Sequence, residues 1–322
     1  MTFIQYLCSS LQIEQPQLLS FLASAPKRYK KYEIPKRNGK GNRLIAHPSK
    51  GLKALQRASL PVIRDKLKVH EAAMAYEKGT GIRRNAIVHR TNRYLLKMDF
   101  SNFFSSIKPN VLIDCLESVD GIISELDQFA FSCLFFWSPT RGSDLELSIG
   151  APSSPFISNA VLYDFDEYIT MYCRENGIVY TRYADDLTFS TNAKGTLFLV
   201  PDMVKKLIKG KSFNYLRVNE DKTVFLSKSC NRHITGITIS NDDELSLGRN
   251  RKRLISSKIH YYLNGKLERE EINQLKGLLG FAKYVEPSFI DKMKSKYGEK
   301  NILAIQKYNL DCKIDDFKNS DE

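Results

Sequence analysis

Two adjacent acidic residues, Asp185 and Asp186, stand between two apolar segments of the sequence. The residues on either side, 177–182 and 187–190, have the composition of strands, which predicts that both carboxylates lie at the tip of a β-hairpin. Neighbouring carboxylates repel each other, and a divalent cation relieves that repulsion by supplying positive charge. The pair therefore indicates a metal site.

A third acidic residue, Asp99, lies near the end of residues 94–100, an apolar segment that predicts a buried strand. If this strand and the Asp185 hairpin are neighbours in one sheet, three carboxylates converge. Three carboxylates can hold two Mg²⁺ ions, which activate an attacking hydroxyl and stabilise the leaving oxygen of a displacement at phosphorus, as in polymerases and nucleases. An Asp-Asp pair alone is more often a solvated turn, so this prediction depends on the surrounding residues.

The composition favours a nucleic-acid partner. The chain has 49 Lys and Arg against 36 Asp and Glu, a net charge of +13, and such an excess attracts polyanions. Its 322 residues, 42% of them hydrophobic, can bury a large core and suggest two or three lobes. No apolar run approaches the roughly 18 residues that cross a bilayer, and the first residues lack the basic region and apolar stretch of a signal peptide, so we expect a cytoplasmic protein without a membrane partner. Six scattered cysteines predict neither a zinc site nor a disulfide framework.

The apolar periodicity predicts helices interrupted by a few strands. Ser154 is expected to cap, and Pro155 to begin, a helix that ends at Gly177. A strand at 222–226 and a hairpin at 234–247 follow. The other predicted helices cover residues 52–67, 111–118, 125–136, 203–209, 249–263, 270–284 and 287–297. Strands mixed with helices before an all-helical tail indicate an α+β fold with a separate helical lobe.

Four segments resemble, in order, the motifs of the reverse transcriptases: residues 96–105, 150–159, 183–186 and 218–223. The resemblance implies a right-hand polymerase. Its N-terminal helices and fingers would be residues 1–93, its palm with interleaved fingers helices 94–240, and the end of its primer grip with a helical thumb 241–322. It also implies that two Mg²⁺ ions are held by Asp99, the Phe100 carbonyl, Asp185 and Asp186.

The same resemblance implies a set of residues that bind the incoming deoxynucleoside triphosphate. Phe104 has the position of an aromatic gate that would clash with a ribose 2′-OH, and Lys222 that of a group near the leaving pyrophosphate. Small residues at 150–152 would let the backbone approach template and nucleotide. Ile149 stands where many members carry Gln, which removes a hydrogen bond near the template but leaves the chemistry intact. The full set is Lys36, Arg43, Phe104, Gly150, Ala151, Pro152 and Lys222.

Two of these residues, Lys36 and Arg43, lie in a strongly basic segment, residues 27–43, around a Gly-rich turn. A basic hairpin could grip phosphates, whereas a charged segment taken alone is more often a solvated loop. Fingers residues of the family hold the triphosphate at these positions. The resemblance therefore favours phosphate binding.

Two further elements resemble those of bacterial retron reverse transcriptases: residues 85–89, of the pattern N-A-x-x-H, and residues 234–236. This resemblance implies a cognate noncoding RNA that is both template and primer. The product would be branched, RNA-linked single-stranded DNA (msDNA) begun at a guanosine 2′-OH, and a separate effector protein would act with the enzyme against phage. The expected RNA-binding residues are Asn85, His89, Thr235, Gly236, Arg249, Arg251, Lys252 and Arg253.

Simpler interpretations of these RNA-binding residues, and other functions for the whole chain, are also consistent with the sequence. Asn85 and His89 could be a pair of hydrogen-bonding residues on a helix surface, and the basic cluster at 249–253 a solvated helix face. An abortive-infection type polymerase that extends DNA without a template is one alternative function. A catalytically idle RNA-binding scaffold is another, although a scaffold does not need three acids and an aromatic gate.

Overall fold

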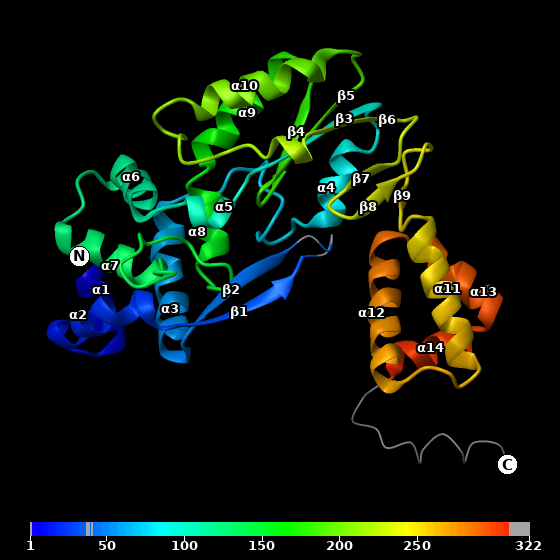
Figure 1. The fold of residues 1–322 in the computed structure, drawn as a ribbon, viewed down its shortest axis with the longest axis horizontal. Coiled ribbons are helices and arrows are strands. Elements are labelled where there is room, and N and C mark those ends of the chain that lie inside the picture. The colour runs from blue at the N-terminus through cyan, green and yellow to red at the C-terminus, as the bar shows by residue number, and fades with distance from the viewer. Residues whose placement is uncertain (1, 37–38, 40, 309–322) are drawn as a thin grey trace. The chain divides into compact units, whose positions relative to one another are not determined.

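The computed structural model describes residues 2–36, 39 and 41–308 (Figure 1). The chain forms two compact units. The first comprises Met1–Gly81 and Asn92–Leu226, and the second comprises Ile82–Thr91 and Ser227–Glu322. The sequence did not predict that residues 82–91, which precede the strand of Asp99, belong to the same unit as the C-terminal part of the chain. No helix in the described ranges is long and apolar enough to cross a membrane.

A four-stranded sheet lies at the centre of the first unit, with the strand order β4-β5-β3-β6. The strands β3 and β5 pair antiparallel, and β4 and β5 form the predicted hairpin. Leu96, Met98, Leu187 and Phe189 are buried along these strands, which explains why alternating apolar residues fold as a sheet here. The bounds are β3 Tyr94–Asp99, β4 Val179–Tyr183, β5 Asp186–Thr191 and β6 Val224–Ser227.

The basic segment of the sequence forms an antiparallel hairpin, called here the fingers hairpin, of β1 (Tyr29–Pro35) and β2 (Asn42–Pro48). Arg37 and Lys40 of that segment lie outside the described residues. Several helices belong to the same unit as this hairpin. At the start of α1, the backbone N–H groups of Phe3 and Ile4 donate to the Asp127 carboxylate at 3.2 and 2.9 Å. These helices are α1 Phe3–Leu11, α2 Gln15–Ser24, η1 Ala25–Lys27, α3 Lys50–Lys66, α6 Pro109–Asp120 and α7 Glu125–Phe135.

The helix predicted from Ser154 to Gly177 is two helices, α8 (Ser154–Ala160) and α9 (Tyr163–Glu175). Its cap is Ser153, one residue earlier than predicted. The break falls in buried apolar residues, where packing rather than a sequence signal decides the backbone. The smaller elements of this unit are α5 Phe103–Ser106, η2 Thr196–Leu199, α10 Val200–Ile208 and η3 Glu220–Lys222.

In the second unit, a small sheet is covered by one helix and continues into a helical bundle. The predicted hairpin at 234–247 is a three-stranded sheet, β7 (Arg232–Ile234), β8 (Ile237–Ile239) and β9 (Leu245–Ser246), and α4 (Ile82–His89) packs on it. The helices that follow are α11 Arg249–Leu263, α12 Arg269–Val285, α13 Pro287–Tyr297 and α14 Glu299–Lys307. The last of these was not predicted, because only two of its residues are buried.

Candidate active site

The three predicted catalytic acids lie at one end of the four-stranded sheet. The register of β3 and β5 places Asp99 directly opposite Asp186. The backbone N–H of Phe100 donates to the carbonyl oxygen of Asp185 at 3.0 Å. Ala184, in the turn, adopts a positive φ of 56°, which lets the chain reverse before the two acids. The sheet therefore brings together residues that lie far apart in the sequence.

The electrostatics of these acids indicate a shortage of positive charge. Burial raises the pKa of Asp186 to about 6, and the charges of Asp185 and Asp99 contribute to that rise. Burial and the charge of Asp99 also raise the pKa of Asp185, although its own backbone, Lys222 and Arg43 oppose that rise. Both shifts have the sign expected of carboxylates that repel each other in a partly desolvated site.

Lys222 supplies the nearest positive charge. Its ammonium donates to both carboxylate oxygens of Asp99, at 2.8 Å each. Burial would lower the pKa of Lys222, but its hydrogen bond to Asp99 and the charges of the acids raise it instead. The side chain thus remains protonated next to the acids.

The donor set fits a divalent cation by its chemistry. Three carboxylates gathered at a sheet end are hard oxygen ligands of the kind that Mg²⁺ prefers. In the part of the chain that the structure describes, however, no three acidic, His or Cys side chains converge as a ready ligand set. Among the described residues the expected convergence therefore holds for the backbone register but not for the side chains, and the Asp99 carboxylate is hydrogen-bonded to Lys222.

A buried polar network that sequence reasoning missed supports the catalytic turn. Arg182 is fully buried on β4, and its guanidinium makes a bidentate ion pair with Asp166 of α9, with N···O distances of 2.6 to 3.1 Å. The same guanidinium donates to the Ala184 carbonyl and to the Asn159 side chain, both at 3.2 Å. Asn159 in turn donates to the Ala75 carbonyl at 2.8 Å. The sequence signal for this network was Arg182 itself, a charged residue in a predicted strand, because a buried charge requires partners.

Of the predicted nucleotide-binding residues, Gly150 has the clearest structural reason. It has a φ of 129°, and a Cβ there would lie 2.9 Å from the carbonyl oxygen of Ala46 in β2. The Ala46 N–H also donates to the carbonyl of Ile149 at 2.9 Å. Gly150 therefore lets the segment before α8 lie against the fingers hairpin. Ala151 is buried and Pro152 half-buried beside it.

Arg43 and Phe104 lie toward the catalytic end of the first unit. Arg43 is exposed on β2, and its charge opposes the rise in the pKa of Asp185. Phe104, on α5, is half-buried and packs edge to face on Phe103 with ring centroids 5.4 Å apart. Lys36 is exposed next to the turn of the fingers hairpin.

Tyr76 is a neighbour of the site that was not predicted. It has a φ of 69°, an uncommon conformation for a residue with a side chain. Burial raises the pKa of Tyr76 to about 12, and the charges of Asp185 and Tyr183 contribute to that rise. Two residues earlier, the Met74 N–H donates to the Arg182 carbonyl at 2.7 Å, which places this segment beside the strand that leads into the catalytic turn. Only the strained backbone distinguishes it, which no sequence pattern reveals.

The predicted RNA-binding residues divide into two groups in the second unit. Asn85 and His89 are fully buried in α4, so direct contact with RNA does not fit their side chains, nor does the alternative of a helix-surface pair. The cause is the small sheet, which packs on α4 and covers this face. Thr235 belongs to the same contact, because its hydroxyl donates to the Ile82 carbonyl at 3.4 Å, and Gly236 is exposed.

The basic cluster at the start of α11 is only partly available. Lys252 makes an ion pair with Glu286 at 2.6 Å, and Arg251 donates to the Gly236 carbonyl at 3.1 Å. Arg249 and Arg253 are exposed, and within the described residues neither side chain makes an ion pair. Within this cluster, these two residues are the cations that a polyanion could reach without breaking a contact that the structure shows.

Comparison with known proteins decides the family. Residues 34–239 match the family model described as reverse transcriptase (RNA-dependent DNA polymerase). The retron Ec83 reverse transcriptase of Escherichia coli is 43% identical over 304 residues, which cover 94% of this chain and 97% of that protein. The chain belongs to the retron reverse transcriptases. The retron Ec73 reverse transcriptase of Escherichia coli is 34% identical over 290 residues, 85% of this chain and 88% of that protein. A solved telomerase from Candida albicans aligns with a TM-score of 0.46 at 14% identity, over 90% of this chain and 63% of that chain.

This retron reverse transcriptase is an RNA-directed DNA polymerase with an RNA partner and, as a member of its family, depends on divalent metal. The predicted α+β right-hand polymerase fold is confirmed. The alternatives of an idle scaffold and an abortive-infection polymerase are set aside, because relatives that match almost the whole chain are retron reverse transcriptases.

Proposed function

We propose that the enzyme copies a structured noncoding RNA, which serves as template and primer, into branched RNA-linked DNA that begins at a guanosine 2′-OH. The order of the four motifs and the relationship to retron enzymes support this proposal. The single observation that carries the chemistry is the register that pairs Asp99 with Asp186 beside Asp185. Such an arrangement suits nucleotidyl transfer, because phosphoryl chemistry depends on charge placed around the reacting phosphate.

Two Mg²⁺ ions would be held by Asp99, Asp185, Asp186 and the Phe100 carbonyl. When bound, they would lower the pKa of the primer hydroxyl and neutralise charge on the triphosphate. The raised pKa values of Asp185 and Asp186 support this role, because a cation would relieve the repulsion that contributes to them.

The chain's own residues would position the deoxynucleoside triphosphate. Arg43, with Lys36, would bind its phosphates from the fingers hairpin. Lys222 would lie at the leaving pyrophosphate and donate a proton to it. Phe104 would exclude a ribose 2′-OH, and the backbone of Gly150, Ala151 and Pro152 would line the space beside template and nucleotide.

The catalytic assignment is tested with Asp185→Asn. The variant should lose primer extension while binding the RNA with near-normal affinity, and Asp202→Asn, an exposed acid of α10, serves as the control. Purified enzyme is incubated with RNA transcribed from beside the gene, and the product is sequenced before and after ribonuclease treatment. Template-encoded DNA joined to RNA supports the proposal. Undiminished synthesis by Asp185→Asn refutes the site, and untemplated product refutes the function.

A role in defence against phage, together with a separate effector protein, is the biological part of the proposal. It rests on the relationship to retron enzymes alone. If it is correct, cells carrying the complete locus should resist phage, and the Asp185→Asn locus should not. Equal plaque counts on both strains would contradict a role for DNA synthesis in defence.

A further inference from the structure

The peptide groups on both sides of Asp185 are held by hydrogen bonds from different parts of the first unit. The Asp185 carbonyl accepts from the N–H of Phe100, the residue after β3, at 3.0 Å. The Ala184 carbonyl, one residue earlier in the turn, accepts from the guanidinium of Arg182 at 3.2 Å. These carbonyls belong to the peptides after and before Asp185. The two bonds therefore fix the backbone from which its carboxylate projects.

The conformation of the turn requires such support. Ala184 has a φ of 56°, which residues with a side chain seldom adopt, and such a backbone persists only where surrounding contacts hold it. Ala184 is also buried, so its carbonyl depends on a partner within the protein. Arg182 supplies that partner.

The guanidinium that reaches the turn is itself held in one position. Its Nε donates to both oxygens of Asp166, at 2.9 and 3.1 Å, and its Nη2 donates to Asp166 Oδ2 at 2.6 Å. Nη1, the nitrogen that reaches Ala184, also donates to the Asn159 side chain at 3.2 Å. Burial would lower the pKa of Arg182, but the charge and hydrogen bonds of Asp166 raise it. The side chain therefore stays charged, and all three of its nitrogens are engaged.

The backbone of Arg182 is anchored as well. Its N–H donates to the Ala72 carbonyl at 2.8 Å, and its carbonyl accepts from the Met74 N–H at 2.7 Å. Asn159 donates to the next carbonyl of the same segment, that of Ala75, at 2.8 Å. Arg182 and its partner Asn159 are thus tied to one segment, residues 72–75. The guanidinium cannot move away from the turn without breaking several buried hydrogen bonds.

We infer that Arg182 is a positioning residue for DNA synthesis, which holds the turn in the conformation that presents Asp185 to metal. Asp166 and Asn159 act by fixing the guanidinium. An ion pair with a structural role alone would stabilise the fold but would leave the catalytic carboxylate in place when it is removed. The inference rests on the proposed role of Asp185 as a metal ligand, and it adds a residue that acts through the turn.

The exchange Arg182→Lys tests this role. Lysine keeps the charge that Asp166 requires, but it lacks the planar fork with which arginine bonds several acceptors at once. The kcat for nucleotide incorporation should fall by about 10- to 100-fold and half-saturation with Mn²⁺ should require about tenfold more metal, as when a partner that orients a metal ligand is lost. Electron paramagnetic resonance measures the binding of Mn²⁺ alone, without nucleotide. The KM for deoxynucleotide and the affinity for RNA should not change; a raised KM with an unchanged kcat would overturn the inference.

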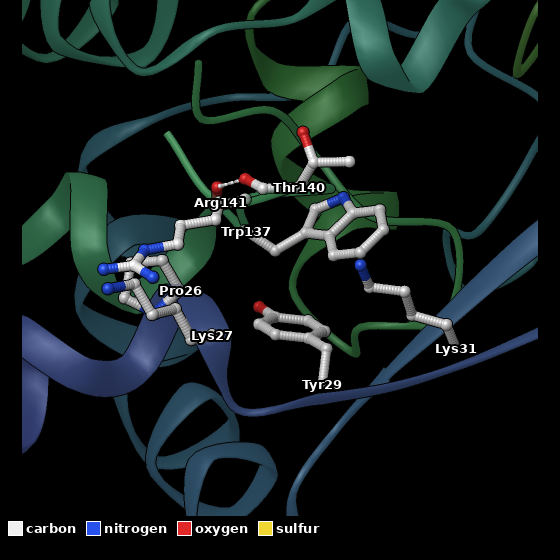
Figure 2. Close-up of a pocket in the computed structure, with 8 residues that line it drawn as sticks. Pro26, Lys27, Tyr29, Lys31, Trp137, Thr140 and Arg141 are labelled. Carbon is white, nitrogen blue, oxygen red and sulfur yellow. Dashed lines mark hydrogen bonds between the residues drawn. The ribbon is translucent and has the colours of Figure 1, made fainter. Parts of the chain in front are cut away.

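Two controls separate positioning from stability. Tyr180→Phe removes a hydroxyl that donates to the same Asp166 carboxylate at 2.7 Å, so it should lower stability but keep the kcat and the Mn²⁺ affinity of the parent. Arg141→Lys makes the same exchange at an exposed arginine. Figure 2 shows Arg141 at a separate pocket of about 370 Å³ between the start of β1 and the loop after α7, and this variant should match the parent in every measurement. If Tyr180→Phe is as slow as Arg182→Lys, loss of stability explains both and the inference is wrong.

A second variant keeps the test decisive if Arg182→Lys does not fold. Replacing a buried ion pair by apolar residues of similar volume is often neutral or stabilising, so the double variant Asp166→Leu with Arg182→Met should fold. It should nevertheless show the same losses of kcat and Mn²⁺ affinity. Values equal to those of the parent, in either folded variant, would overturn the inference and leave the proposed function standing. If Asp185→Asn binds Mn²⁺ as tightly as the parent, the proposed metal site fails and the inference fails with it.

Discussion

The ammonium of Lys222 lies 2.8 Å from both carboxylate oxygens of Asp99. The backbone fixes this contact, because the Asn219 N–H donates to the Asp99 carbonyl at 2.8 Å and holds η3 against the end of β3. The Lys222 side chain is 53% exposed, so it can leave the carboxylate without breaking a packed core. The two residues therefore form a pair that a cation and a triphosphate can separate, with the carboxylate free for metal and the ammonium for phosphate.

Replacing Lys222 tests its proposed role as a proton donor. General acid catalysis contributes about 10²–10⁴-fold, so Lys222→Ala should slow single-turnover nucleotide incorporation by at least about a hundredfold. Lys222→Arg should be slow too, because a guanidinium keeps its charge but does not release a proton. Lys205→Ala, which removes an exposed cation paired with Glu220 of η3, is the control. Rapid-quench kinetics measure the single-turnover rate of each variant. If Lys222→Arg is as fast as the parent enzyme, Lys222 acts through its charge and not as a proton donor.

The aromatic gate at Phe104 is tested by making it smaller. Phe104 leans on Phe103, which stacks on Phe100 with centroids 5.9 Å apart, so its ring is supported from behind. Phe104→Val should raise the relative use of ribonucleotides by about 10- to 100-fold, the discrimination expected from one steric contact. The ratio of kcat/KM for a deoxynucleotide and its ribonucleotide measures the effect. Phe129→Val, on the exposed surface of α7, should not change the ratio, and an unchanged ratio for Phe104→Val would exclude a gate.

Gly150 should not tolerate a side chain. In Gly150→Ala the new Cβ would meet the Ala46 carbonyl at 2.9 Å on a backbone with φ of 129°. We expect a loss of about 1–3 kcal/mol of stability or a displaced fingers hairpin with weaker nucleotide binding. Gly51→Ala is the matched control, since nothing lies within 4 Å of its Cβ and α3 should gain about 0.5–1 kcal/mol. Urea unfolding and nucleotide KM together check the prediction, and equal behaviour of both variants would contradict it.

The strands that carry the acids were predictable, because residues 94–99 are mostly apolar up to Asp99 and apolar residues stand on both sides of Asp185 and Asp186. Helices α11 and α13 begin and end at the predicted residues, because Gly248, Pro287 and Gly298 mark their ends. The division of the helix at residues 161–162 was not predictable. Those residues are apolar and buried, and only their packing in the core determines the break.

The candidate site could be predicted to the level of its residues but not of their side-chain contacts. Motif order placed Asp99 near Asp185, whereas the Lys222 contact depends on the fold. The burial of Asn85 and His89 depends on strands β7 and β8, which come much later in the chain. A local pattern cannot distinguish an exposed polar pair on a helix from one that a distant sheet covers.

The two exposed arginines of α11 should contribute to RNA binding through charge. Arg249→Gln with Arg253→Gln should weaken binding and reduce the slope of log affinity against log salt by about 1–2, since each phosphate contact contributes a little under one. Lys252→Gln is the contrasting variant. Its ion pair with Glu286 belongs to the second unit itself, so it should lower stability more than it alters the salt slope. An unchanged salt slope in the arginine variant would place the RNA elsewhere.

Burial of His89 predicts an acid-sensitive fold. The pKa of His89 is lowered by burial from its ordinary 6.5 to about 3. Between these values the unfolded chain binds a proton that the folded chain does not. Above pH 6.5 the imidazole is neutral in both states, and His89 does not make the free energy of unfolding depend on pH. As the pH falls from 6.5 toward 3, the free energy of unfolding decreases by about 1.4 kcal/mol per pH unit.

Removing the imidazole should remove this dependence. Urea unfolding of the parent and of His89→Gln at several pH values gives a stability difference that shrinks as the solution becomes more acidic, because only the parent bears the cost of keeping its imidazole neutral. His260→Gln, an exposed histidine of α11, should follow the parent at every pH. A difference between the parent and His89→Gln that stays constant from neutral to acidic pH would mean that His89 titrates in the folded enzyme as it does in the unfolded chain.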